Sequence, residues 1–206
     1  MNVDRLIKIR LYNKYRYLHY LKLKQQSTSN NFSNNSSNIV KIENNINDED
    51  IIKIIENTIT TIISLSIRKR ISIFKSCNII KYFSQNTQSE MVYLLDNYIV
   101  CKVFKANQKG FVLWKNELNT LQKIITLQCV PKLIAYNRLV IYMTYCGTLI
   151  NKSNLPTDWH DQINDIFKEF RKKRVNPNDT LDRNICVLNG KINFIDFGLA
   201  NNNMTD

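Results

Sequence analysis

The strongest constraint on the fold is a hairpin pattern near the C-terminal end of the sequence. Two short apolar runs, NICVL and INFID, flank Asn189 and Gly190, and this dipeptide favours the left-handed backbone of a two-residue hairpin turn. The hairpin predicts that three polar residues lie together: Asp179 and Asn184 on the loop before its first strand, and Asp196 at the end of its second. Two carboxylates and a carboxamide form a hard oxygen-ligand set, which suits Mg²⁺ carrying nucleotide phosphates.

Short strands and two helices are predicted upstream of this hairpin. Four runs are rich in β-branched and aromatic residues: MVYLLDN, which begins at Met91, then YIVCKVFK, KLIAYN and RLVIYMTY. Two segments with helical periodicity, residues 111–127 and 158–173, interrupt these strands. The predicted order is strand pair, helix, strand pair, helix, hairpin, and this order predicts an α+β fold.

Composition divides the chain into four regions. Residues 1–24 are predicted to form a basic helical arm, and residues 25–47 a polar, low-complexity linker. In residues 48–81, isoleucines recur at helical spacing after three acidic residues, which predicts an amphipathic helix over about 48–69. Residues 82–206 are the fourth region and are predicted to form the main folded domain.

The charge of the chain has an unequal distribution. The formal net charge is +12, from 29 Lys and Arg against 17 Asp and Glu, and residues 1–24 supply half of it with seven basic residues and one acid. Lys, Asn and Ile are over-used while there are only 4 Gly and 3 Pro. An AT-rich genome, as in some large DNA viruses, raises Lys without selection for nucleic-acid binding. A solvated basic arm is therefore favoured, and contact with RNA or a membrane surface is the alternative.

Several features favour an intracellular protein. The hydrophobic share of 44% is ordinary for a globular chain and excludes wholesale disorder. The five cysteines show no CxxC spacing and are predicted to be reduced core thiols. Residues 1–20 lack an uninterrupted apolar stretch, so no signal peptide is expected, and charged residues interrupt the Ile-rich stretch 51–74, so no transmembrane segment is expected. We expect the cytoplasm of the cell or host, with the virion as the alternative.

The residues around the hairpin resemble a known superfamily. DxxxxN followed by DFG, here Asp179 to Asn184 and then Asp196, resembles the catalytic loop and metal-binding turn of the protein-kinase-like superfamily. In the same order as in that superfamily, Lys102 stands on a predicted strand and Glu117 on the helix that follows. The run MTYCG resembles the hinge between the two lobes.

The resemblance covers about residues 83–200 and implies a fold, cofactors and roles. The implied fold is a reduced bilobal protein-kinase-like fold with a small antiparallel N-lobe sheet, a truncated C-lobe and an N-terminal helical extension. The implied cofactors are ATP and Mg²⁺. The implied roles are as follows: Asp179 is the catalytic base, Asn184 and Asp196 hold Mg²⁺, Lys102 grips the α/β phosphates, Glu117 positions Lys102, and the backbone around Tyr145 meets the adenine.

Three departures from the superfamily pattern bear on activity. Pro177 stands where the superfamily has the His of HxD, and the run FSQNTQSE from Phe83 to Glu90 contains no glycine. The sequence given ends ten residues after Asp196, without an APE motif. The expected function is an ATP-dependent phosphotransferase acting on protein Ser/Thr hydroxyls, as a small atypical member, of large-DNA-virus type. An inactive pseudokinase that serves as a binding or scaffolding module is the alternative. A vestigial kinase-like part beside an RNA- or membrane-binding basic arm is a third possibility.

Overall fold

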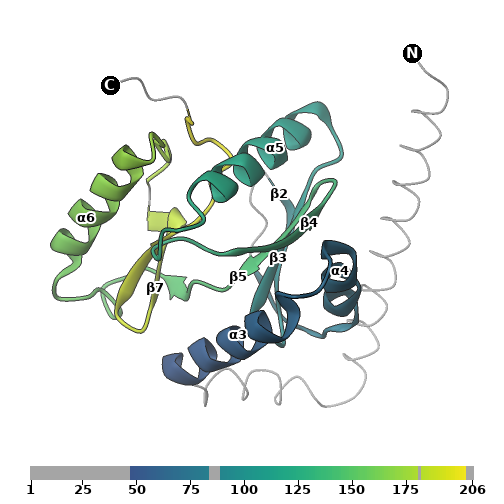
Figure 1. Cartoon of the computed structure of the whole chain (residues 1–206). Helices are drawn as coiled ribbons and strands as arrows, with labels where there is room; N and C mark the ends of the chain where they lie inside the picture. The colour runs from purple at the N-terminus through teal and green to yellow at the C-terminus, as the bar shows by residue number, and fades with distance from the viewer. Residues whose placement is uncertain (1–46, 84–88, 181, 203–206) are drawn as a thin grey trace. The chain divides into compact units, whose positions relative to one another are not determined.

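A five-stranded antiparallel sheet forms the larger of two sheets in the part of the chain that the structure describes. The computed structural model describes residues 47–83, 89–180 and 182–202. The strands follow the order β1-β2-β3-β5-β4, and every neighbouring pair is antiparallel. Their bounds are β1 Ile79–Phe83, β2 Ser89–Leu95, β3 Ile99–Phe104, β4 Leu133–Asn137 and β5 Val140–Thr144 (Figure 1).

The second sheet contains the hairpin that the sequence predicts. Strands β6 (Thr148–Leu149), β7 (Ile185–Leu188) and β8 (Lys191–Phe194) pair in that order. Asn189 and Gly190 form the turn between β7 and β8 with φ of 48° and 67°. Both values lie in the left-handed region, as a type I′ turn requires, so the predicted hairpin is confirmed.

Four α-helices complete the described part of the chain, which has an α+β fold as predicted. They are α3 (Asp48–Ile62), α4 (Ile67–Ser76), α5 (Gln108–Lys123) and α6 (Trp159–Lys172). Helix α5 begins and ends a few residues earlier than the predicted 111–127. Its start is set by Asn107, whose side chain accepts a hydrogen bond from the Gly110 N–H. None of these helices is long and apolar enough to cross a membrane.

The single helix predicted over 48–69 is wrong, because the structure divides it into α3 and α4. Ser66 has an extended backbone (ψ 152°) at the start of α4. Arg70 then donates hydrogen bonds to the Leu65 and Ile63 carbonyls, which lie just after the end of α3. The isoleucine periodicity continues across the break and hides it. Strand β1, which was not predicted, begins at Ile79, so the boundary between residues 81 and 82 falls inside a strand.

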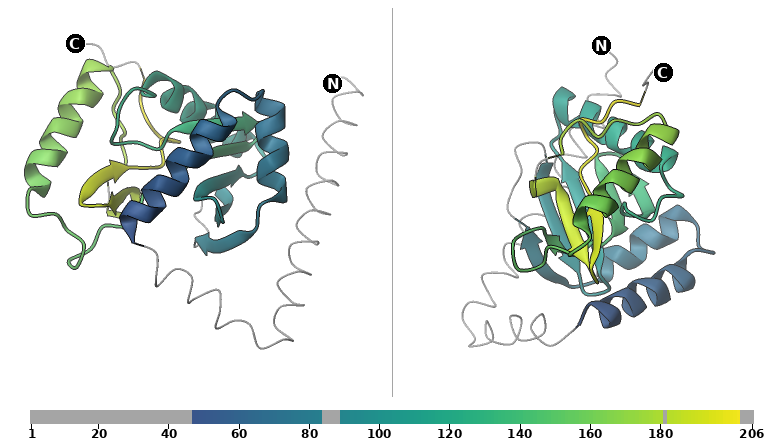
Figure 2. Two further views of the ribbon diagram at one scale, coloured as in Figure 1. Left: turned by 60° about the horizontal axis from the view of Figure 1, so that its bottom comes forward. Right: turned by 90° about the vertical axis from the view of Figure 1, so that its left-hand side faces the viewer.

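Helices α3 and α4 pack on one face of the five-stranded sheet (Figure 2). Ile62 and Phe74 join a buried apolar cluster with Ile99 and Cys101 of β3 and with Tyr142 of β5. The Phe74 and Tyr142 rings stack with centroids 5.0 Å apart. Side chains alternate along a strand. The β3 residues that alternate with Ile99 and Cys101 therefore point to the opposite face of the sheet, where α5 lies.

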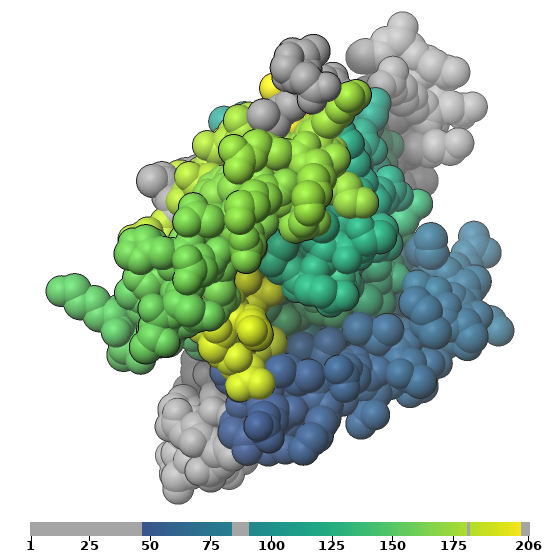
Figure 3. Space-filling model, turned by 60° about the vertical axis from the view of Figure 1, so that its left-hand side comes forward, coloured from purple at the N-terminus to yellow at the C-terminus, as the bar shows by residue number. Residues whose placement is uncertain are grey.

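Helix α3 also contacts the second sheet. The Asp48 carboxylate accepts a hydrogen bond of 2.6 Å from the Asn189 N–H at the turn of the β7–β8 hairpin. Figure 3 shows the start of α3 in dark blue against the yellow tip of this hairpin. One helix therefore joins the hairpin turn to the core of the five-stranded sheet. Residues 48–81 and 82–202 accordingly belong to one compact unit, which begins at Asn47.

We expect Phe74→Ala to destabilise the protein by about 3–5 kcal/mol, because truncation of a buried phenylalanine leaves a cavity. Phe74 is 2% exposed. Urea denaturation measures the change. The matched control is Ile63→Ala in the neighbouring turn, where the side chain is 56% exposed and the loss should stay within about 0.5 kcal/mol. Equal losses for the two variants would contradict the packing of α4 on the sheet.

Candidate functional site

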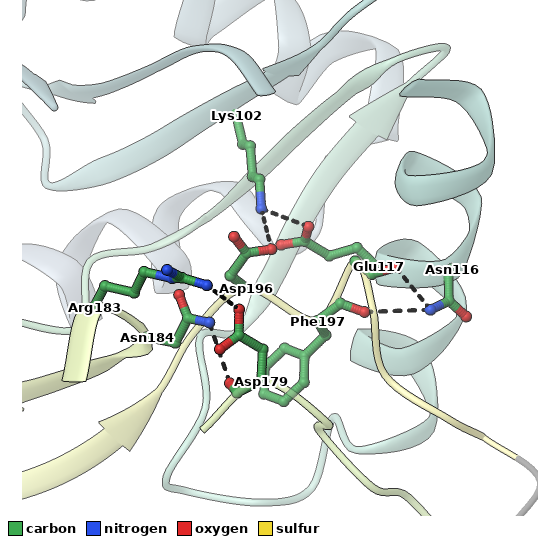
Figure 4. A network of polar contacts seen from close by, with 9 residues as sticks. Lys102, Asn116, Glu117, Asp179, Arg183, Asn184, Asp196 and Phe197 are labelled. Atoms are coloured by element: carbon green, nitrogen blue, oxygen red, sulfur yellow. Dashed lines mark hydrogen bonds and ion pairs between the residues drawn. The ribbon is translucent and has the colours of Figure 1, made fainter. Parts of the chain in front are cut away.

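A buried lysine between two carboxylates is the centre of the candidate site. Lys102 is 5% exposed. Its Nζ atom lies 2.7 Å from Glu117 Oε2 and 2.8 Å from Asp196 Oδ1 (Figure 4). The structure thus brings together three of the residues that the sequence singled out, from positions up to 94 residues apart.

Three different elements supply these side chains. Lys102 lies on β3 between two residues that face the apolar cluster, so strand alternation turns it toward α5. Glu117 lies on the buried face of α5. Asp196 follows the end of β8 with a φ of 63°. A left-handed backbone is costly for a residue other than glycine and is often found at functional positions.

Burial and mutual attraction set the protonation of this group. Burial raises the pKa of the Glu117 carboxyl to about 7, since the loss of water outweighs the attraction of Lys102 and the nearby Asp196 adds repulsion. For Lys102, burial acts to lower the pKa, but the two carboxylates outweigh it and raise the pKa above the usual value. Lys102 therefore remains an ammonium at neutral pH.

Asp179 and Asn184 form a second polar cluster beside this group. Asn184 is 3% exposed, and its Nδ2 donates to the Asp179 carbonyl at 3.1 Å. The Asn184 carbonyl accepts from the Ile195 N–H at 2.9 Å, which ties this loop to the residue before Asp196. Figure 4 shows the Asp179, Asn184 and Asp196 side chains gathered below Lys102 in that view. The structure therefore places both predicted metal-ligand residues and the predicted base on one side of Lys102.

An aromatic cluster supports the chain around Asp196. Phe194 and Phe197, on either side of it, are 1% and 0% exposed. Both rings pack edge-on against Phe170 of α6, with centroids 5.6 and 6.0 Å away. Helix α6 thus packs under the chain on both sides of Asp196.

Tyr145 has a different environment from the other predicted site residues. It lies between β5 and β6, where its ring packs 5.9 Å from Tyr98 and 6.5 Å from Phe83. The Tyr145 N–H donates to the Tyr98 carbonyl at 3.1 Å. This backbone donor is therefore used within the protein.

Two polar residues of the site were missed from the sequence. Arg183, in the 3₁₀ turn η1 (Asp182–Asn184), pairs with Asp179 Oδ2 at 2.9 Å. Asn116 of α5 donates to backbone carbonyls of the chain after Asp196. Neither residue has a distinctive sequence context. The only available indication was adjacency, because each precedes a residue that was singled out, Asn184 and Glu117.

The donor atoms fit a metal that also binds phosphate oxygens. The described residues hold no group of three or more His, Cys, Asp or Glu side chains suited to a metal. Mg²⁺ commonly uses one or two carboxylates together with substrate phosphates and water. Asp196 and the Asn184 carboxamide offer the hard oxygen ligands for that arrangement.

No protein-family model matches the chain, and neither does any curated protein.

We expect the Glu117 carboxyl to make stability depend on pH. Its folded pKa of about 7 exceeds the reference value of 4.5. The folded state therefore binds this proton more tightly than the unfolded state does. The stability that the bound proton contributes is lost as pH rises from about 4.5 through about 7. Between pH 5 and pH 7.5, wild type should lose on the order of 2 kcal/mol more than Glu117→Gln. Urea titrations measure this, with exposed Glu49→Gln as control. Parallel pH profiles for wild type and Glu117→Gln would refute the raised pKa.

Proposed function

We propose that this protein is a small, atypical kinase-like phosphotransferase that uses Mg·ATP and acts on a protein Ser/Thr hydroxyl. The observation that carries the proposal is the Lys102 ammonium in contact with both Glu117 and Asp196. The resemblance requires a strand lysine paired with a helix acid and adjacent to the DFG aspartate. Contacts of 2.7 and 2.8 Å between these residues agree with that requirement.

The arrangement of elements supports the same proposal. An antiparallel sheet with one helix between β3 and β4 carries Lys102, and a separate hairpin sheet carries Asn184 and Asp196. A reduced bilobal kinase-like fold requires the site residues to come from two separate sheets, one in each lobe. Tyr145, Cys146 and Gly147 connect the sheets, where the resemblance expects a hinge.

The charges of the site suit phosphoryl transfer, which depends on alignment and charge neutralisation. Lys102 would bind phosphate oxygens of ATP, while Asn184 and Asp196 would hold Mg²⁺. Bound Mg²⁺ would neutralise negative charge on the transferred phosphoryl group. Glu117 would keep Lys102 in place, and Asp179 would accept the proton of the attacking hydroxyl.

Backbone groups in the connection between β5 and β6 would bind the adenine of ATP. Because the Tyr145 N–H already donates to the Tyr98 carbonyl and the Thr144 N–H to the Lys132 carbonyl, we assign adenine recognition to backbone groups of Cys146. This assignment refines the role that the resemblance gave to the backbone around Tyr145.

A pseudokinase is the second candidate function, and one contact favours it. Arg183 holds Asp179 Oδ2 at 2.9 Å, although the carboxylate of a general base must be able to meet its substrate hydroxyl. Pro177 in place of the usual His and the absence of glycine in residues 83–90 point the same way. The tether through the basic arm concerns residues 1–24, which lie outside the described residues.

We expect Mg·ATP to raise the melting temperature of the wild type, because a ligand stabilises the state that binds it. At a hundredfold excess over Kd the gain is about 2.7 kcal/mol, or roughly 5–10 °C for a protein of this size. EDTA should reduce the gain, and Asp196→Asn should remove its Mg²⁺-dependent part. Asp165→Asn on α6, where the side chain is 72% exposed, is the control. No thermal shift of the wild type at millimolar Mg·ATP would defeat the proposed function.

We expect Asp179→Asn to lower phosphate transfer by about 10²–10⁴-fold, because general-base catalysis contributes that factor. Mg·ATP binding should remain at the wild-type level. Radiolabelled transfer to a peptide mixture measures the rate, and Asp182→Asn, an exposed carboxylate in the same loop, is the control. Mg·ATP binding without any transfer by the wild type would select the pseudokinase.

A further inference from the structure

One carboxamide of α5 contacts several backbone carbonyls of the chain that follows Asp196. Asn116 Nδ2 donates to the Gly198 carbonyl at 2.9 Å and to the Ala200 carbonyl at 2.8 Å. A longer contact of 3.5 Å reaches the Phe197 carbonyl (Figure 4). One side chain therefore satisfies backbone acceptors on both sides of a bend in this segment.

Asn202, at the end of the same segment, donates hydrogen bonds back to α5. Its Nδ2 donates to Asn116 Oδ1 at 3.2 Å and to Thr120 Oγ1 at 2.8 Å. Asn116 and Thr120 lie one helical turn apart on α5. The segment 197–202 is thus bound along one face of α5 through side chains rather than through a strand ladder.

Asn116 is adjacent to Glu117, which contacts the other end of the same segment. The Glu117 carboxylate bonds to the Lys102 ammonium and also accepts a hydrogen bond from the Phe197 backbone. Asp196, the residue before Phe197, has a left-handed φ of 63°. Such a conformation costs roughly 1 kcal/mol or more and persists only where surrounding contacts hold it.

We propose that Asn116 is a positioning residue that holds Asp196 in this left-handed conformation. Its three carbonyl contacts fix the chain immediately after Asp196, so that the Asp196 carboxylate stays beside Lys102. The effect of Asn116 on Mg²⁺ binding rests on the proposed function. Its effect on the backbone conformation of the chain after Asp196 is independent of that function.

Other contacts hold the same segment from the opposite side. Asn178 Nδ2 donates to the Leu199 carbonyl at 2.8 Å. Asn176 and Asn201 exchange backbone hydrogen bonds of 2.8 and 2.7 Å. We therefore expect substitution of Asn116 to loosen the segment locally and to leave the fold intact.

The first measurement is amide hydrogen exchange of the peptide 195–202 in the full-length protein without nucleotide. Asn116→Asp keeps the shape of the side chain but replaces its donor with an acceptor, and Asn116→Ala removes both groups. Loss of these hydrogen bonds should speed exchange about tenfold, the factor expected for a net loss near 1.4 kcal/mol. Asn119→Ala, an exposed asparagine on the same helix, should exchange like the wild type. Unchanged exchange in both Asn116 variants would overturn the inference.

The second measurement is the affinity for ATP with Mg²⁺ and with EDTA, by calorimetry. Both Asn116 variants should bind Mg·ATP about tenfold more weakly than the wild type and Asn119→Ala, while their affinity for ATP in EDTA stays unchanged. A purely structural role would lower both affinities together. Wild-type affinity for Mg·ATP in Asn116→Asp would show that packing alone suffices and would overturn the positioning role.

The two measurements separate the inference from the proposed function. If the wild type fails to bind Mg·ATP, the proposed function falls, and the exchange data alone decide whether Asn116 holds the segment. If the wild type binds Mg·ATP but exchange and affinity are unaffected in the Asn116 variants, the proposed function survives and the inference is overturned.

Discussion

The structure depends on one buried ammonium that joins three elements. Lys102 of β3 bonds to Glu117 of α5 and to Asp196 after β8. Buried charges are tolerated only when they are paired, and removal of one partner typically costs about 3–5 kcal/mol. The five-stranded sheet, its helix and the hairpin sheet must therefore keep one relative arrangement.

The left-handed backbone at Asp196 is the second constraint. Apolar contacts with α6 hold the chain on both sides of this residue, and hydrogen bonds from α5 hold the chain after it. Phe194 and Phe197 anchor the chain below it through Phe170 of α6. Asn116 holds the chain after it against α5. The carboxylate is thus placed by a rigid apolar base and by directional hydrogen bonds. Apolar packing fixes where the segment lies, whereas hydrogen bonds fix the backbone conformation.

Local patterns predicted the elements whose cause is local. The Asn189–Gly190 turn forms as expected, because only a few residue types accept two successive left-handed conformations. Helices α5 and α6 were predicted within a few residues of their ends. The break between α3 and α4 was missed, because Arg70 satisfies carbonyls near the end of α3 and the break needs no glycine or proline. The short strand β6 was missed as well, since its two residues are defined only by their pairing with β7.

The sequence by itself determined the α+β order of elements, the hairpin, and the identity of the residues that carry the candidate chemistry. Each of these follows from periodicity, turn preference or a short motif within a window of neighbouring residues. The tertiary structure alone decided that Lys102, Glu117 and Asp196 meet, that Arg183 pairs with Asp179, and that Asn116 secures the segment after Asp196. Contacts between residues such as Lys102 and Asp196, 94 positions apart, depend on how elements pack, and no local pattern encodes that packing.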